Sequence, residues 1–271
     1  MNTIRTPVCI VGAGPAGTTA SIFLSKYGIE HVMVERKSLP FDKVCGESFA
    51  GRVMNVLNEI DPQWAAALFR NKAVIQSRVI NCFWQPHKRK FKLAFPPGSK
   101  PFLKATRSFF DHALLQKARE SALLTYIDNC NITEFKKQTD GVRLSDCRSG
   151  ICIETNLVLM CVGDKTTSLH HIFPDYIIDG VRYLASRQYF EQVSYDDDDN
   201  ATELYFYHNP FIYYIYTTRL PNNQAMVEIF TTKKYAEKMN LNLAYNLKDS
   251  LAKTERLKKR VENARPLGKP K

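Results

Sequence analysis

Residues 7–35, PVCIVGAGPAGTTASIFLSKYGIEHVMVE, decide the fold. The apolar run at 7–11 predicts a buried strand, and the glycine-rich stretch GAGPAG follows it directly. Residues 18–27 then have helical spacing, and a second apolar run at 31–34 predicts a strand that ends in Glu35. The helix face predicted to be buried carries Ala20, Phe23, Leu24 and Tyr27.

Chain geometry explains why glycine stands at each of three positions in this stretch. Gly12 permits the tight strand-to-helix turn, Gly14 lets the backbone approach a pyrophosphate, and Gly17 lets the helix pack closely on the strand. The helix N-terminus offers unpaired N–H groups and a positive dipole end to phosphates. Glu35, 18 residues after Gly17, can hold ribose hydroxyls. The predicted cofactor-binding residues here are Gly12, Ala13, Gly14, Pro15, Ala16, Gly17 and Glu35.

Composition narrows the class of protein. The 271 residues are 44% hydrophobic and 24% charged, which is typical of one large globular domain or two. The net charge of +11 is spread along the chain without a nucleic-acid motif, so no nucleic-acid partner is expected. The apolar runs are too short to span a bilayer and no signal-peptide pattern is present, which favours a cytoplasmic location. Seven irregularly spaced cysteines predict neither disulfides nor a metal site.

Two further segments make the prediction more specific. They are DKVCGES at 42–48 and TRSFFD at 106–111. Together with GAGPAG, they resemble the geranylgeranyl reductase-like family of FAD-dependent oxidoreductases, within the p-hydroxybenzoate hydroxylase-like superfamily. The resemblance is strongest at 7–50 and 104–120. It implies an α/β fold in which a Rossmann-like FAD-binding domain carries an inserted antiparallel β-sheet substrate domain.

The resemblance also implies site residues. Glu35 would hold the adenosine ribose, and Arg36 and Arg107 would lie against FAD. The turn at 45–47 would lie near the isoalloxazine ring, with Cys45 and Gly46 as cofactor contacts. Cys45 and Glu47 are the candidate catalytic residues. A loop cysteine without a chemical role and an ordinary solvated carboxylate are equally open for these two positions.

The predicted substrate domain is rich in aromatic residues. Alternating apolar positions at 73–93 and 204–230 predict strands. Prenyl reductases of the resembled family carry a Y-x-W-x-F-P stretch that faces the lipid. Residues 212–217 match it in aromatic character but lack the Trp and Pro. Tyr214 and Tyr216 are therefore predicted to line a substrate pocket, and a sheet packed on its own core is the alternative.

The domain boundaries follow from the same resemblance. The predicted parts are 1–72 with 101–175 for FAD, 73–100 with 176–235 for the substrate, and a helical segment at 236–271. Residues 157–162 predict a buried strand, after which Lys165 departs from the family's DG-x-x-S. The acidic run at 196–199 is expected to be solvated.

The end of the sequence carries two expectations. Residues 234–264 predict a long amphipathic helical region, whose basic end leaves peripheral contact with a membrane surface open. In the family the chain returns to the FAD domain with a second GD motif. The 271 residues lack that motif, so the expectation is a chain without this C-terminal part.

Several functions remain open at this stage. The first is an FAD-dependent oxidoreductase, with NAD(P)H as electron donor, that acts on an apolar, aromatic or lipid-like small molecule. Double-bond reduction and monooxygenation are both possible, and halogenation is a third reaction. A truncated flavoprotein fragment without turnover, serving at most as a binding module, is the alternative. Arg107 and the turn at 45–47 disfavour an NAD-only dehydrogenase. The sequence leaves the oligomeric state open.

Overall fold

The chain was analysed as a computed structural model, which divides by its internal contacts into two compact units. The first comprises residues 1–42 and 108–179, and the second comprises 43–107 and 180–271. Residues 43–72, which the sequence analysis assigned to the FAD-binding part, group here with the second unit. The structure describes residues 2–38, 43, 45, 47–85, 89–163, 181–195, 200–208 and 213–271.

The first unit is a six-stranded sheet with helices. Its strands run in the order β8-β2-β1-β11-β10-β9. The first four are parallel and the last two are antiparallel additions. The parallel part has the 3-2-1-4 order of a Rossmann-like sheet, which confirms the predicted fold class. The elements are β1 (Asn2–Val11), α1 (Pro15–Lys26), β2 (His31–Val34), α4 (Arg107–Arg119), β8 (Leu124–Ile127), β9 (Glu134–Gln138), β10 (Gly141–Asp146) and β11 (Ile151–Met160).

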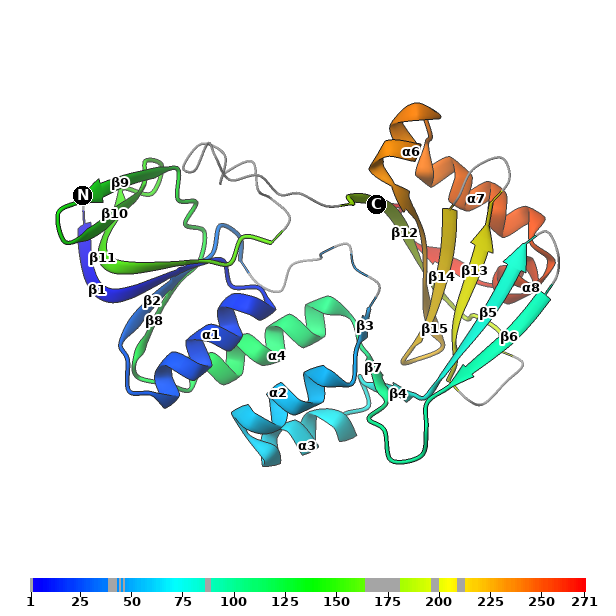
Figure 1. The fold of residues 1–271 in the computed structure, drawn as a ribbon, viewed down its shortest axis with the longest axis horizontal. Coiled ribbons are helices and arrows are strands. Elements are labelled where there is room, and N and C mark those ends of the chain that lie inside the picture. The colour runs from blue at the N-terminus through cyan, green and yellow to red at the C-terminus, as the bar shows by residue number, and fades with distance from the viewer. Residues whose placement is uncertain are drawn as a thin grey trace. The chain divides into compact units, whose positions relative to one another are not determined.

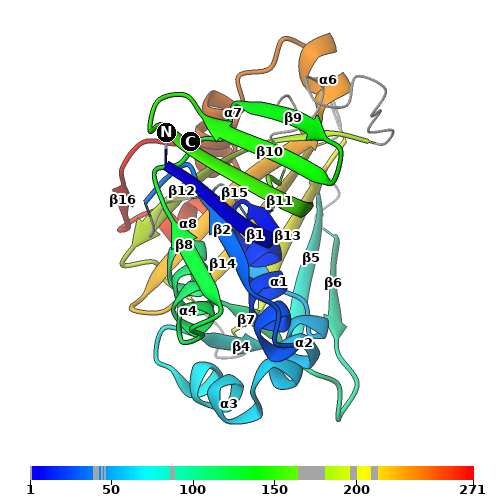
Figure 2. The same cartoon turned by 90° about the vertical axis from the view of Figure 1, so that its left-hand side faces the viewer.

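Helices α1 and α4 lie on the same face of this sheet (Figures 1 and 2). Ile10 and Met33 point toward that face and pack with Leu115 of α4. The opposite face carries Val32 and Ile153. The sheet is thus buried on both sides, as a parallel sheet requires.

The predicted apolar face of α1 is confirmed in part, since Ala20 and Leu24 pack against the cluster of Ile10 and Met33. Tyr27, however, is 76% exposed. The buried residues of the helix are Gly17, Thr18, Ser21 and Ile22. The reason is that small side chains let the helix approach the sheet closely. Ser21 Oγ lies 2.7 Å from His31 Nε2, which satisfies both buried polar groups.

The predicted buried strand at 157–162 is confirmed in part. Residues 157–160 are the end of the longer strand β11 and pair with β1. Leu157 is 52% exposed, because the neighbouring strand β10 pairs with β11 only as far as Thr155. The residues after Leu157 pack against the cores on the two faces of the sheet.

The second unit contains a seven-stranded and a three-stranded sheet. The large sheet has the order β16-β12-β15-β14-β13-β5-β6, and the small one has the order β3-β7-β4. The large sheet is mostly antiparallel, as predicted. The strands are β3 (Ser48–Phe49), β4 (Ile75–Ser77), β5 (Val79–Gln85), β6 (Arg89–Ala94), β7 (Phe102–Lys104), β12 (Tyr183–Glu191), β13 (Thr202–Tyr207), β14 (Tyr213–Leu220), β15 (Gln224–Thr232) and β16 (Arg265–Leu267).

Five helices accompany these strands in the described part of the second unit. They are α2 (Arg52–Ile60), α3 (Pro62–Arg70), α6 (Lys233–Lys238), α7 (Leu243–Lys253) and α8 (Glu255–Val261). Leu247 of α7 and Leu257 of α8 cover one face of the large sheet and pack with Tyr205, Ile215 and Ile229. Figure 1 shows these helices along the sheet in orange and red. That face is the core of the unit.

The helical region predicted at 234–264 is helical over most of its length, but it is divided into three short helices, α6, α7 and α8. Its predicted apolar leucines face the core. The Thr232 and Asn242 side chains accept hydrogen bonds from backbone N–H groups at the starts of α6 and α7, which is how such residues begin helices. The chain then pairs with β12 through β16. This pairing extends to Lys271, whose backbone N–H and C=O both bond the backbone of Arg187.

A buried ion cluster fastens α8 to the core face. Glu203 of β13 is 1% exposed. Its carboxylate accepts from Arg260 Nε at 2.7 Å and Nη2 at 2.6 Å, and from Arg256 Nε at 2.9 Å. Tyr205 donates a further hydrogen bond of 2.9 Å. Burial would raise the pKa of Glu203, but the two guanidinium groups outweigh it and hold that pKa below its usual value.

We expect Glu203→Gln to destabilise the second unit by about 3–5 kcal/mol, because it leaves Arg260 buried without its counter-charge. The loss should be full above the ordinary pKa of 4.5 and should shrink as the pH falls below it, since the unfolded chain then takes up a proton. It should vanish once the pH falls below the lowered pKa of the native carboxylate. Urea unfolding at several pH values measures this. Glu255→Gln, which breaks the exposed pair with Lys259, is the matched control. Equal effects of the two substitutions would contradict the interpretation.

Candidate functional site

The loop between β1 and α1 is held by two glycine contacts. Gly12 has φ +107°, and a Cβ there would lie 2.4 Å from the Cys161 carbonyl oxygen. A Cβ on Gly17 would lie 1.9 Å from the Gly12 carbonyl oxygen. No side chain fits at either position, so β1, α1 and the end of β11 meet at van der Waals distance. This is where the strand order reverses, and open α/β sheets bind ligands at such a point.

Gly14 has a different role in the same loop. It has an ordinary φ of −72°, and a Cβ there would meet nothing within 4 Å. Gly14 is also the N-cap of α1, so no side chain caps the first N–H groups of that helix. The protein itself therefore does not require glycine here. The open space above a helix N-terminus fits a phosphate group of a dinucleotide.

Glu35 lies where the sequence places it, at the end of β2. It is 7% exposed, and its carboxylate accepts from the Ala13 N–H at 2.9 Å and the Lys37 N–H at 3.1 Å. A carboxylate has about four acceptor positions, so it can still accept hydroxyl groups. The structure thus links Glu35 directly to the loop between β1 and α1, which we call the phosphate loop. The neighbouring Arg36 is exposed.

The candidate residues at 45–47 belong to the second unit. Cys45 is half-buried and free, and Gly46 lies outside the described residues. Glu47 is fully buried and has φ +52°, a conformation that non-glycine residues adopt rarely and often at functional sites. The Glu47 carbonyl oxygen accepts from Ala105 N, which places it near Arg107, itself 7% exposed.

The Glu47 side chain reaches the large sheet. Its Oε1 accepts from Arg187 Nη1 at 2.5 Å and from the Tyr189 hydroxyl. Burial raises the pKa of Glu47, although the Tyr189 hydrogen bond and the Arg187 charge oppose this rise. Arg187 is 2% exposed. The interpretation of Glu47 as an ordinary solvated carboxylate is therefore wrong.

A second carboxylate faces the same guanidinium. Glu228 of β15 lies directly across from Arg187 in the strand register. Burial and the nearby charge of Glu47 raise the pKa of Glu228 to about 7, and Arg187 opposes them. Sequence reasoning missed Arg187, Tyr189 and Glu228. A carboxylate inside the otherwise apolar run AMVEIF at 225–230, at Glu228, was the available signal.

Tyr214 and Tyr216 lie on the sheet face opposite α7 and α8. Aromatic rings cross this face from strand to strand: Trp84 stacks on Phe206 at 5.8 Å, Phe206 meets Tyr214 at 5.5 Å, and Tyr214 stacks on Phe230 at 5.1 Å. We call Trp84, Phe206, Tyr214 and Phe230 the aromatic stripe. Trp84 is 40% exposed, so no described residue of the second unit fully covers this end of the stripe. The interpretation of these tyrosines as pocket residues stays a prediction.

Comparison with known proteins identifies the family. A family model described as an FAD binding domain matches residues 5–150, more than half of the 271 residues. The chain belongs to this FAD-binding family. The match includes Glu35 and the glycine loop between β1 and α1. The predicted flavoprotein superfamily is thereby confirmed.

Individual relatives are more distant. Menaquinone reductase from Mycolicibacterium smegmatis is 38% identical over 60 residues, which is 22% of this chain and 14% of that protein. A geranylgeranyl bacteriochlorophyll reductase-like structure from Thermoplasma acidophilum has a TM-score of 0.78 at 18% identity, over 98% of this chain and 65% of that one. The flavin-dependent brominase Bmp2 gives 0.78 at 17% identity, over 98% and 66%. The chain therefore spans about two thirds of these structures, and they show the shared fold.

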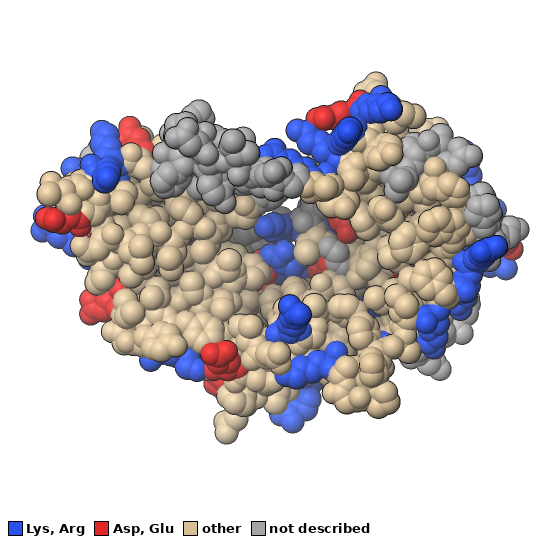
Figure 3. Space-filling view, in the orientation of Figure 1, with Lys and Arg blue, Asp and Glu red and all other residues tan. Residues whose placement is uncertain are grey.

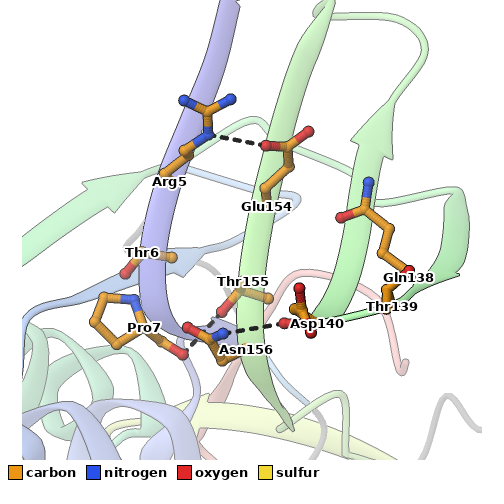
Figure 4. Close-up of a pocket in the computed structure, with 9 residues that line it drawn as sticks. All are labelled: Arg5, Thr6, Pro7, Gln138, Thr139, Asp140, Glu154, Thr155 and Asn156. Carbon is orange, nitrogen blue, oxygen red and sulfur yellow. Dashed lines mark hydrogen bonds and ion pairs between the residues drawn. The ribbon is translucent and has the colours of Figure 1, made fainter.

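One shallow cavity lies away from the phosphate loop. It has a volume of about 590 Å³ and is lined by the middle of β1 and β11 and by the turn between β9 and β10. Figure 4 shows that Arg5 pairs with Glu154 and that Asn156 donates to the Asp140 carbonyl oxygen across it. These side chains satisfy one another, so the cavity offers no evident chemistry.

The surface of the described residues does not point to a further binding site. Basic side chains on the face drawn in Figure 3 are scattered among other residues rather than gathered in one patch. Within the described ranges, no helix has the length and hydropathy to cross a membrane, and no metal-binding group of His, Cys, Asp and Glu occurs. The acidic run at 196–199 and Lys165 lie outside those ranges.

The two glycines allow packing and cofactor binding to be tested separately. We expect Gly17→Ala to destabilise the first unit by about 3 kcal/mol, since its Cβ cannot fit against Gly12. Gly14→Ala should change the free energy of unfolding by no more than about 1 kcal/mol. It should weaken FAD binding roughly tenfold or more, which corresponds to a loss of about 1.4 kcal/mol in binding free energy. Thermal unfolding and flavin titration measure the two effects. A Gly14→Ala protein that binds FAD as well as the parent would contradict this assignment.

Proposed function

We propose that this protein is an FAD-dependent oxidoreductase that acts on an apolar, aromatic or lipid-like small molecule and takes electrons from NAD(P)H. The observation that carries the proposal is the unfilled space at Gly14, above the uncapped N-terminus of α1. The membership in the FAD-binding family supports the choice of FAD over other dinucleotides.

The residues of the first unit would hold the adenosine half of the cofactor. The backbone at Gly14 and the N–H groups of α1 bind the pyrophosphate, and the Glu35 carboxylate accepts the ribose hydroxyls. FAD, once bound, supplies the two-electron redox chemistry. Arg36, Arg107 and the turn at Cys45 and Gly46 are the proposed further contacts. A cytoplasmic location and peripheral membrane contact belong to this proposal as well.

The aromatic stripe supports an apolar or planar substrate. Stacked and edge-on rings offer a large apolar surface with preferred orientations for a bound ring or chain. Tyr214 and Tyr216 are the proposed substrate contacts. The Thermoplasma protein is named as reductase-like and Bmp2 as a brominase, so double-bond reduction is proposed first and monooxygenation second.

The visible spectrum of the purified chain tests the function. We expect flavin bands that bleach when NAD(P)H is added without oxygen and return when substrate or oxygen is admitted. The Gly14→Ala protein, prepared in parallel, should retain much less flavin at the same stability. A colourless wild-type protein that does not retain added FAD would refute the proposal. Retention without bleaching would instead favour a flavin-binding module.

A further inference from the structure

Glu228 occupies a distinctive place on the aromatic side of the large sheet. In the strand register it lies directly across from Arg187 of β12 and from Tyr216 of β14. Directly paired residues point to the same face of a sheet, as do residues two apart on one strand. Phe230, two positions along β15, belongs to the aromatic stripe. Glu228 therefore borders the stripe and lies next to the predicted contact Tyr216.

Two carboxylates lie close to Arg187, and they differ in exposure. Glu47 is 0% exposed and Glu228 is 8% exposed. Arg187 Nη1 is engaged by Glu47 Oε1 and by the Tyr189 hydroxyl. The Arg187 guanidinium also lies 4.6 Å from the centre of the Tyr189 ring. These contacts fix Arg187, and Glu228 is the more exposed of the two carboxylates, on the face of the sheet that carries the stripe.

The charges of these groups favour a state in which one of the two carboxyl groups keeps its proton. Two carboxylates and one guanidinium carry a net charge of −1 when both acids are ionised, which is unfavourable in a buried site. The groups facing Glu228 are Arg187 from β12, Tyr216 from β14 and Glu47 from the segment before β3. With a pKa of about 7, Glu228 is populated in both its acid and its base forms near neutral pH, as efficient proton transfer requires.

The backbone at Glu47 supports a functional reason for this arrangement. Its φ of +52° is a conformation that costs about 1–3 kcal/mol for a non-glycine residue. The conformation directs the carboxylate of Glu47 to Arg187. A simple ion pair between one acid and Arg187 would not need this strained backbone. The strained backbone keeps two carboxylates, those of Glu47 and Glu228, beside one guanidinium.

We propose that Glu228 transfers a proton to a substrate lying on the aromatic stripe, and that Arg187, held by Glu47 and Tyr189, positions it. The proposal rests on the proposed function, which supplies the reduced flavin. Double-bond reduction needs a hydride at one substrate carbon and a proton at the other, and bound reduced FAD would supply the hydride and be oxidised. The Glu228 carboxyl group would give its proton to the carbon that keeps the π electron pair. Glu228 would then be a carboxylate, and water would restore its proton.

The first test needs neither FAD nor substrate. Carbon-13 NMR of glutamate-labelled protein follows each carboxyl carbon with pH. We expect the highest-titrating carboxyl to have a midpoint near 7 and to be absent from Glu228→Gln. Glu191→Gln is the matched control, because Glu191 lies on β12 in an ion pair with Arg265, and it should leave that signal unchanged. The proposal is overturned if no carboxyl titrates well above 4.5, or if the signal persists in Glu228→Gln.

The second test follows proton transfer itself. FAD-loaded protein is reduced with dithionite and mixed without oxygen with geranylgeraniol or with menadione. Reoxidation by wild type and by Glu191→Gln should slow as the pH rises through about 7, since the acid form is consumed. Reoxidation of Glu228→Gln should be roughly 100-fold slower below that pH and should not vary with pH.

The remaining outcomes separate the two proposals. A Glu228→Gln protein with wild-type rates and pH dependence overturns the role of Glu228 while the oxidoreductase stands. A reduced wild-type protein that reacts with neither compound counts against the stripe as a substrate surface. Loss of flavin bands or of NAD(P)H bleaching in wild type and both variants alike is the failure of the proposed function. That failure overturns the inference with it.

Discussion

The close contact between Gly17 and Gly12 is the constraint on which the cofactor half of the molecule depends. It brings the first turn of α1 against the end of β1, and Gly12 in turn lies against the Cys161 carbonyl oxygen at the end of β11. The helix N-terminus is thereby fixed at the point where the strand order reverses. Glu35 is tied to the same loop through Ala13. Gly14 is left as the one glycine of the three whose missing side chain leaves space for something other than protein.

Two buried glutamates of the second unit have pKa values that are shifted in opposite directions. Glu203 faces two arginines, and its pKa is held below the usual value. Glu228 shares a single arginine with Glu47, and its pKa is raised to about 7. Burial acts in the same direction on both. The ratio of acids to guanidinium groups therefore decides which carboxylate fastens a helix and which can exchange a proton.

The sequence predicted what short-range patterns encode. The strand, glycine loop, helix and acid at 7–35 could be assigned because each position has a local steric or electrostatic reason. The pairing of Glu47 with Arg187 could not, since 140 residues separate them and Glu47 lies outside the large sheet that carries Arg187. On α1, Ala20 and Leu24 were predicted correctly as core contacts, but the burial of Ser21 and Thr18 was missed because these residues are polar yet small. The region at 234–264 was predicted to be helical, but its division was missed because Asn242 caps a new helix there.

The backbone pairing of Lys271 with Arg187 has a practical meaning for anyone who handles this chain. The backbone N–H and C=O of Arg187 at that edge both pair with the backbone of Lys271. A spectroscopic probe attached at position 271 would therefore lie beside the backbone that holds the charged network. Such a probe would report on the network, and a bulky one would disturb it.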